Sequence, residues 1–258
     1  VSLDYDDDLN REVMLKPLAS TSLPKRKYKR SELFHAMLIR SDNGAAETIA
    51  SDYPGGRSKF IHAMNRKALQ IGMLSTYFKD PTGLSISNTG TAIDVSNMVI
   101  AASYYSVIRE TSIKKQALIE TQHKKRIRTI ALKNTNQPLL FEFDNIIISK
   151  TGFTNPAGWC VALMVEKKQR VPIEKDLIYK ITEFVKQESK PDYNEEIHRH
   201  VIVVLGAKNK QDRIDKVKSI MYNEIIDNEI PENIDGYQRG NAPHKKSRRI
   251  RSMGKSSR

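Results

Sequence analysis

The chain has 258 residues, of which 39% are hydrophobic, and this length is sufficient for a folded domain with a buried core. No apolar run is long enough to cross a membrane, and the single cysteine, Cys160, excludes an internal disulfide. The formal charge of +13 predicts an anionic partner such as a cell-wall polymer, a lipid headgroup or a nucleic acid.

The two ends of the chain differ in composition from the region between them. Residues 1–30 are first acidic and then basic, which predicts an irregular lead-in. Residues 31–230 have the periodic apolar pattern of one domain, and residues 231–258 form a basic, polar tail that we expect to be disordered when free. Because the chain begins with Val1 and shows no signal peptide, we expect it to be a processed product or a fragment.

The first half of the domain has the apolar spacing of helices. Ser31 can cap a helix that runs towards Ser41, and the triplet Ser41-Asp42-Asn43 forms a tight connection to a second helix. Thr91 and Asp94 resemble a capping box at the start of a later helix. The apolar residues that define the four expected helices lie within residues 33–38, 45–50, 60–71 and 98–105.

The second half of the domain predicts strands and two further helices. An apolar run that ends at Lys150-Thr151-Gly152 is followed by the turn Asn155-Pro156-Ala157-Gly158 and a second apolar run, which predicts a hairpin. The basic segment 114–128 indicates a solvated helix or an exposed hairpin in preference to a specific anion site. The remaining elements are expected at 173–185 (helix), 201–205 (buried strand) and 214–225 (helix).

The triplet Lys150-Thr151-Gly152 has the composition of a clamp for an anionic acyl group. The ammonium supplies positive charge, the hydroxyl donates to a carboxylate, and the glycine lets a substrate backbone approach without a Cβ in the way. The tripeptide alone is common. It gains significance here because Ser41-Asp42-Asn43 precedes it in the order and at the distance typical of one family.

Several further motifs occur in the order found in that family. The sequence resembles the low-molecular-weight penicillin-binding proteins, which are D-alanyl-D-alanine carboxypeptidases of the peptidase S11 type, and above all their murein DD-endopeptidase branch. The motifs that carry the resemblance over residues 30–165 are Ser41-Asp42-Asn43-Gly44, Tyr53-Pro54-Gly55-Gly56, Ala63-Met64-Asn65, Asp80-Pro81-Thr82-Gly83, Lys133-Asn134-Thr135-Asn136 and Lys150-Thr151-Gly152-Phe153-Thr154-Asn155.

The resemblance implies an α+β fold of the serine β-lactamase and DD-peptidase type. Such a fold has an antiparallel sheet flanked by helices, and here we expect it to be N-terminally incomplete. The implied activity is acyl transfer through a serine, without a cofactor or a metal, on the stem peptides of peptidoglycan.

The resemblance also assigns roles to individual residues. Ser41 would relay a proton towards the leaving amine, Asn43 would bind a substrate amide, and Lys150 would add positive potential. Thr151 and Gly152 would hold the substrate, and the backbone N–H of Phe153 would form half of an oxyanion hole, in which fixed donors stabilise developing negative charge.

The nucleophile motif is the point at which this sequence departs from the family. The family's Ser-x-x-Lys pair lies on the order of 60 residues before the Ser-x-Asn triplet, which reaches beyond Val1. The literal match Ser22-Leu23-Pro24-Lys25 lies much closer to Ser41, and its proline disfavours the helix that would place Ser22 and Lys25 on one face. We therefore expect the nucleophile upstream, and we expect this chain alone to form no penicillin adduct.

Three hypotheses for function remain open. The chain belongs to a peptidoglycan DD-endopeptidase or carboxypeptidase, to an inactive relative that binds wall peptide or is a structural subunit of a larger assembly such as a phage particle, or to a basic nucleic-acid-associated protein. The family implies a location in the periplasm or in contact with the cell wall. The basic tail is expected either to bind an anionic polymer, membrane or nucleic acid, or only to keep the terminus soluble.

Two other candidate sites have ordinary structural explanations. Cys160 lies within an expected strand beside Trp159, so we expect a buried structural thiol rather than a nucleophile. His198 and His200 have the spacing of one strand face, but no cysteine or carboxylate pattern accompanies them. We expect surface histidines there and no metal site.

Overall fold

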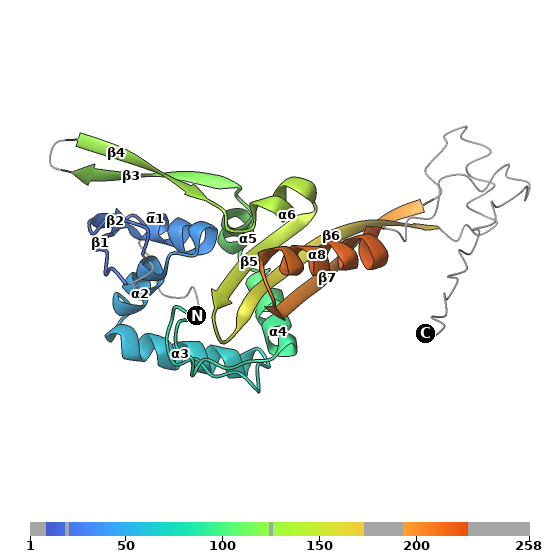
Figure 1. The fold of residues 1–258 in the computed structure, drawn as a ribbon, viewed down its shortest axis with the longest axis horizontal. Helices are drawn as coiled ribbons and strands as arrows, with labels where there is room; N and C mark the ends of the chain where they lie inside the picture. Colours follow the sequence, from blue (N-terminus) through green and yellow to red (C-terminus); the bar gives the residue numbers. More distant parts are fainter. Residues whose placement is uncertain (1–8, 19–20, 124–125, 173–192, 227–258) are drawn as a thin grey trace, which may run out of the picture. The chain divides into compact units, whose positions relative to one another are not determined.

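The structure is a computed structural model that describes residues 9–18, 21–123, 126–172 and 193–226 (Figure 1). The chain divides into two compact units, Val1–Asn228 and Glu229–Arg258, and every described residue belongs to the first. The helix expected at 173–185 and the tail at 231–258 lie outside the described residues. The domain boundaries after residues 30 and 230 remain predictions.

A three-stranded antiparallel sheet forms the centre of the described unit (Figure 1). Its strands are β5 (Ile146–Thr154), β6 (Gly158–Pro172) and β7 (Tyr193–Ala207), paired in that order. The expected hairpin and the expected buried strand at 201–205 are confirmed. β5 continues through Lys150-Thr151-Gly152, which pairs with Ala162, Val161 and Cys160 of β6.

Helices cover both faces of this sheet. Successive side chains of a strand point to opposite faces, and here both faces carry apolar side chains that the helices bury. On one face, Leu163, Val204 and Val217 belong to a core shared with α6 (Gln137–Glu142), α8 (Lys210–Ile220) and the π-helix η2 (Met221–Ile226). On the other face, Ile148 and Met164 pack against Val99 of α4 (Ala92–Ala102). Each fully buried aliphatic side chain contributes about 1.5–3 kcal/mol. The predicted α+β class is confirmed.

Thr91 caps α4, since its hydroxyl accepts a hydrogen bond from the Asp94 amide at 3.2 Å, but the predicted capping box is incomplete. The Asp94 carboxylate accepts from the Ser75 amide and the Thr76 hydroxyl instead of from the Thr91 amide. α4 ends at Ala102, and Tyr105 precedes a separate helix instead of continuing it.

The other helices are α1 (Arg30–His35), the π-helix η1 (Ala36–Arg40), α2 (Asn43–Ser51), α3 (Gly56–Gln70) and α5 (Ser106–Ser112). Among the described helices, none combines the length and the apolar character needed to cross a bilayer.

The segment before Ser31 is more ordered than an irregular lead-in. It contains β1 (Glu12–Met14) and β2 (Lys27–Lys29), which pair as antiparallel strands. The pairing holds because Leu15 and Tyr28 are buried in a second core, together with Leu33 of α1 and Ile39 of η1. α1 consequently starts two residues earlier than expected, and its cap residue is Lys29 rather than Ser31.

The basic segment 114–128 belongs to an antiparallel hairpin, so the second of the two predicted alternatives holds. The hairpin consists of β3 (Gln116–His123) and β4 (Arg126–Lys133), and it extends away from the helices beside it (Figure 1). Ile119 and Leu132 anchor it in the second core. Leu118 and Ile127, on the other face, are 68% and 70% exposed.

Candidate active site

Ser41 lies in a sharp bend between η1 and α2. Its backbone is left-handed, with φ 59° and ψ 40°. The chain therefore changes direction at this residue, between the end of η1 and the start of α2. Asp42 caps α2, since its carboxylate accepts from the Ala45 amide at 2.9 Å and from both the amide and the hydroxyl of Ser22 at 2.7 Å. The cap fixes the direction in which the Ser41 side chain leaves the bend.

Lys150 reaches this bend from the central sheet. Its Nζ donates to Ser41 Oγ at 2.6 Å and to the Thr151 carbonyl oxygen at 2.6 Å. Thr151 Oγ1 donates to Thr135 Oγ1 at 2.6 Å, and the Thr135 amide donates to the carbonyl oxygen of Ile39 in η1 at 3.1 Å. A continuous set of hydrogen bonds therefore joins β5, the Asn134–Asn136 segment and the Ser41 bend.

These residues line one cleft of about 1230 Å³. The structure brings together in this cleft all six residues to which the resemblance gave catalytic or substrate-binding roles. They are Ser41, Asn43, Lys150, Thr151, Gly152 and Phe153. The sequence pattern predicted their proximity, and their individual roles remain predictions.

The loop Asp80–Ser85 forms another wall of the cleft, and one carboxylate holds it in shape. The oxygens of Asp80 accept from the amides of Thr82 at 2.6 Å, Gly83 at 2.7 Å and Ser85 at 2.5 Å. Burial by itself raises the pKa of Asp80, but these hydrogen bonds to the charged form outweigh burial and leave the pKa below its ordinary value.

Arg213 of α8 is a cleft residue that the sequence interpretation missed. Its side chain is 2% exposed, lines the cleft and lies over the Trp159 ring at 5.7 Å. Nη1 donates weakly to the Cys160 carbonyl oxygen at 3.5 Å, whereas Nε and Nη2 are buried without a hydrogen-bond partner. No local motif could have indicated this residue, because Arg213 belongs to an ordinary amphipathic helix far along the chain.

Basic side chains outnumber acidic ones around the cleft, which is lined by Arg40, Lys133, Lys150, Lys210 and Arg213 and by Asp42 and Asp80. Burial, with a further contribution from the Arg213 charge, lowers the pKa of Lys150 to about 8. Burial also lowers the pKa of Arg213. Among the described residues, no carboxylate forms an ion pair with either side chain. A half-buried ammonium and a buried guanidinium in this arrangement favour an anion between them, since burying charge without a partner is costly.

Phe153 and Trp159 form an aromatic edge of the cleft, with ring centroids 4.5 Å apart. Beside them, Gly152 leaves room, because a Cβ there would meet nothing closer than the Cys160 Cβ at 3.9 Å. Cys160 was expected to be fully buried, but it is half-buried and lines the cleft, and its Sγ donates to the Ala157 carbonyl oxygen at 3.5 Å.

Neither of the two Ser-x-x-Lys matches among the described residues has the geometry of a nucleophile pair. Ser22 and Lys25 lie in an irregular segment outside the cleft, and the Ser22 hydroxyl supports the Asp42 cap. The sequence contains two further matches that our interpretation overlooked, Ser112-Ile113-Lys114-Lys115 and Ser252-Met253-Gly254-Lys255, of which the second lies outside the described residues. Ser112 is 1% exposed and ends α5, while Lys115 lies over the Phe141 ring at 4.6 Å. Serine and lysine therefore share no helix face in either match.

The two histidines considered as metal ligands lie on β7. His198 is 3.4 Å from Glu196, and its neighbour Arg199 pairs with Glu166 at 2.9 Å. In the part of the chain that the structure describes, no group of three or more His, Cys, Asp or Glu side chains is placed to hold a metal ion.

Comparison with known proteins gives a consistent result. The family model for D-alanyl-D-alanine carboxypeptidases, peptidase S11, matches residues 9–174. The D-alanyl-D-alanine endopeptidase of Escherichia coli is 33% identical over 179 residues, which are 69% of this chain and 57% of that protein. The D-alanyl-D-alanine endopeptidase of Pseudomonas aeruginosa is 36% identical over 134 residues, 52% of this chain and 43% of that protein. The chain thus spans about half the length of the curated relatives it matches.

Solved structures show the same fold at lower sequence identity. The Streptomyces K15 DD-transpeptidase superposes with a TM-score of 0.67 at 22% identity, covering 84% of this chain and 79% of that one. Penicillin-binding protein D2 of Listeria monocytogenes, in its cefotaxime-bound form, gives a TM-score of 0.61 at 23% identity, covering 84% and 78%. The comparisons lend no support to the alternative of a phage-particle subunit.

Proposed function

Because this chain belongs to the D-alanyl-D-alanine carboxypeptidase family, peptidase S11, we propose that it provides the substrate cleft of a peptidoglycan DD-peptidase. The proposed reaction is serine acyl transfer, which cleaves either the terminal D-Ala–D-Ala bond or the D-Ala–diaminopimelate crosslink of stem peptides. The attacking serine lies outside the described residues. The matching endopeptidases favour the crosslink as the substrate. We propose the periplasm or the cell wall as the site of action.

The hydrogen bond between Lys150 Nζ and Ser41 Oγ, 2.6 Å long, is the observation that carries the proposal. It connects a sheet residue and an interhelical residue that are far apart in the sequence, and it does so inside a cleft. The lowered pKa of Lys150, about 8, suits a group that gives and regains a proton near neutral pH. Lys150 would donate to Ser41 as Ser41 passes its own proton to the departing amine.

Substrate recognition would depend on the carboxylate next to the scissile amide. In both candidate substrates the amine product carries such a carboxylate, so one cationic site serves either bond. The free donors of Arg213, together with the Thr151 hydroxyl and the Lys150 charge, would bind it by charge-assisted hydrogen bonds. Asn43 would bind a substrate amide, and the Phe153 amide would contribute to an oxyanion hole.

Calorimetric binding of a D-Ala–D-Ala peptide to the full chain tests this proposal. We expect a peptide with a free C-terminal carboxylate to bind and its C-terminal amide to bind at least about tenfold more weakly, since a charge-assisted hydrogen bond contributes about 1.5–3 kcal/mol. Arg213→Gln should remove the difference between the two peptides, whereas Arg128→Gln, on the exposed β4 strand, should keep it. Equal affinity of both peptides for the unchanged chain would refute the proposed cleft chemistry.

A second candidate function is binding of wall peptide without hydrolysis. One observation favours it: neither Ser-x-x-Lys match among the described residues forms a helical pair facing the cleft. A fluorescent penicillin separates the two functions. We expect no covalent label on the chain alone, and a polypeptide that restores the nucleophile should become labelled and should cleave crosslinked muropeptide dimers. Peptide binding without such a gain would support the binding function.

A further inference from the structure

Cationic side chains from two sets of elements line the cleft, and the proposed function uses only one set. Lys150 and Arg213 belong to the central sheet and to α8, where Lys210 also lines the cleft. Arg40 ends η1 and Lys133 ends β4, and both of these line the cleft as well. Arg40 and Lys133, which we call the rim pair, have no part in the proposed binding of the carboxylate next to the scissile amide.

The two members of the rim pair stand on segments that are packed together. The Thr135 amide, two residues after Lys133, donates to the carbonyl oxygen of Ile39 at 3.1 Å, and Ile39 directly precedes Arg40. Ile39 and Leu132, the residue before Lys133, are buried in the same core. The backbone therefore brings both cationic residues to the same part of the cleft.

The rim pair has no acidic partner in the part of the chain that the structure describes. Both side chains are exposed, and no carboxylate there forms an ion pair with either. The acidic residues that line the cleft are engaged elsewhere, since Asp42 is 2% exposed and caps α2, and Asp80 is 8% exposed and accepts from amides of its own loop. A cleft wall with charges of one sign raises the local concentration of an anionic ligand.

The rim pair lies on the side of the cleft at which the leaving amine is proposed to depart. Ser41, the proposed proton donor to that amine, directly follows Arg40 in the chain. On the other segment, Thr135 Oγ1 accepts a hydrogen bond from Thr151 Oγ1 at 2.6 Å. The acyl side of the substrate is expected further along β5, at the Phe153 amide. A group bound by the rim pair would therefore belong to the released half of the substrate.

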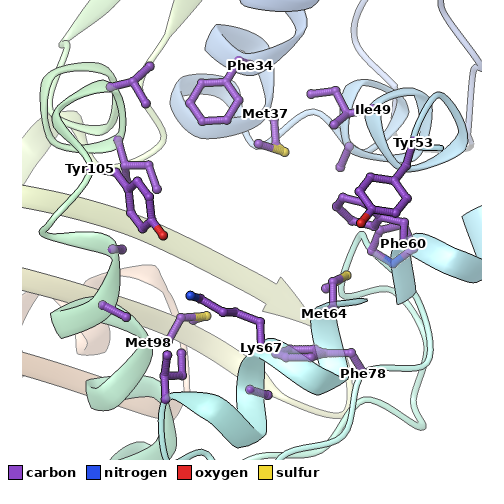
Figure 2. A pocket seen from close by; sticks show the side chains of 18 of the residues that line it. Phe34, Met37, Ile49, Tyr53, Phe60, Met64, Lys67, Phe78, Met98 and Tyr105 are labelled. Atoms are coloured by element: carbon purple, nitrogen blue, oxygen red, sulfur yellow. The ribbon is translucent and has the colours of Figure 1, made fainter. Parts of the chain in front are cut away.

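The wall of the cleft on the side of the helical region cannot bind an anion. There the cleft borders an apolar groove of about 420 Å³ (Figure 2), and every lining residue that the two cavities share is apolar. Met37, Met64, Phe78 and Met98 are among them. A carboxylate placed against such a wall loses hydration without gaining a hydrogen bond. Substrate carboxylates therefore find partners at the rim pair or beside the central sheet.

The two candidate bonds differ in the number of carboxylates on their leaving groups. Cleavage of a D-Ala–D-Ala terminus releases D-Ala, whose single carboxylate would be bound by Arg213 and Thr151. Cleavage of a crosslink releases a second stem peptide, which has one carboxylate beside the scissile amide and others further along. Only the crosslink therefore presents a carboxylate to a second cationic position.

We propose that Arg40 and Lys133 form a second anion subsite, which binds a further carboxylate of the released stem peptide and makes the cleft selective for crosslinks over D-Ala–D-Ala termini. This proposal rests on the proposed function for the position of the leaving amine. Arg40 supplies two parallel N–H donors to a carboxylate, and Lys133 adds a point charge. Because both side chains are exposed, salt screens their contribution, whereas the contribution of the buried Arg213 persists.

Calorimetry with three branched peptides and the full chain tests the subsite. In each peptide a D-Ala carbonyl is joined to the side-chain amine of diaminopimelate, and the carboxylate beside that amide is kept. The first peptide keeps every other carboxylate of the released branch, the second has its terminal D-Ala carboxylate amidated, and the third has its glutamyl carboxylate amidated. We expect one of the two amidations to weaken binding about tenfold in about 0.01 M salt and hardly at all in about 1 M salt, where the screening length is about 3 Å.

Substitutions assign this effect to the rim pair. Arg40→Gln and Lys133→Met should each reduce the effect of the amidation to about threefold, and the double variant should abolish it. The matched control combines Lys59→Met and Arg66→Gln, which removes two exposed charges of α3 outside the cleft and should leave the effect at about tenfold. Circular dichroism establishes that each variant folds. Lys133→Met decides the matter if Arg40→Gln disturbs the Ser41 bend.

Three outcomes overturn the proposal. They are equal affinity for all three peptides, an amidation effect that persists in about 1 M salt, and an effect that the double variant leaves unchanged. None of them bears on the proposed function, which is tested by amidating the carboxylate beside the scissile amide and by Arg213→Gln. If that adjacent carboxylate makes no difference while the rim pair still discriminates among the branched peptides, the proposed cleft chemistry fails and the anion subsite stands.

Discussion

Among the described residues, Ser41 is the only non-glycine residue with a positive φ. A left-handed backbone at a residue with a Cβ costs about 1–2 kcal/mol. The sequence tolerates that cost at the one position where the bend directs a hydroxyl at Lys150 Nζ. Such local strain is often found where a side chain needs a direction that a regular helix does not provide. The backbone at Ser41 thus agrees with a functional rather than a structural use of its side chain.

Lys150 gives the clearest prediction at the scale of a single residue. Its pKa is about 8 in the folded chain, against about 10.4 for an unfolded lysine, so between these pH values the unfolded chain binds more protons. The free energy of unfolding should therefore rise with pH in this range, by up to about 3 kcal/mol relative to the Lys150→Met variant. Urea unfolding of both proteins between pH 7 and pH 10.5 measures the difference. Parallel pH profiles would contradict the burial of this ammonium.

At the scale of elements, the β5–β6 hairpin depends on Gly158. This residue has φ +68°, and a Cβ there would lie 3.0 Å from the Ala207 carbonyl oxygen and 3.1 Å from the Gly206 Cα, both backbone atoms. Gly158→Ala should lower the free energy of unfolding by about 2–4 kcal/mol, because backbone strain and a backbone clash add.

Gly56→Ala is the matched control for that substitution. Gly56 has φ +76°, but a Cβ there would meet nothing within 4 Å, so we expect only the conformational cost of about 1–2 kcal/mol. Thermal or urea unfolding of the two variants measures both effects. Equal losses of unfolding free energy in the two variants would show that the close approach of a Cβ at position 158 to β7 does not destabilise the fold.

The elements that the sequence predicted well are those with local signals. The Lys150 hairpin has two apolar runs and a turn rich in Pro and Gly, and the helix after Thr91 has its cap. The weakest predictions concern residues 9–30, where β1 and β2 are only three residues each. These strands are ordered because Leu15 and Tyr28 enter a core formed by distant elements. No local sequence pattern reveals such long-range packing. The π-helix η1 likewise has no signal in the apolar spacing.

The candidate site was predictable as far as it consists of motifs. The Ser41 bend and the Lys150 strand were recognisable, and the structure brings them into contact. Arg213 was not, because its importance comes from burial beside Lys150 and Trp159, and burial depends on how α8 crosses the sheet. The apolar groove of about 420 Å³ lined by α3 was equally unpredictable, since the apolar residues of α3 have the spacing of any helix that faces a core.

At the scale of the whole molecule, the excess positive charge is unevenly distributed. Residues 241–258 carry seven of the Lys and Arg side chains and no Asp or Glu, in a chain with a formal charge of +13. Binding to a polyanion such as double-stranded DNA should weaken as salt increases, because each phosphate contact releases counterions.

Deletion of residues 241–258 should reduce the slope of log affinity against log salt concentration by up to about 6. Fluorescence anisotropy at several salt concentrations measures the slope. Peptide binding in the cleft should not change on deletion, since the cleft is formed by residues 37–213. An unchanged slope would locate the polyanion contacts on the folded unit instead.

The groove also has a consequence for redox chemistry. Four of the side chains that line the apolar groove of about 420 Å³ beside the cleft, Met37, Met64, Met73 and Met98, are thioethers, and Met98 is 39% exposed. Peroxide converts a thioether to a sulfoxide, which is polar and chiral, and enzymatic reduction reverses the change. The flexible, polarisable sulfur atoms that let the groove adapt to an apolar surface would then repel it. Oxidising conditions would therefore make this groove polar, and the change would reach the wall of the cleft as well, because Met37, Met64 and Met98 line both. A reductase would reverse it.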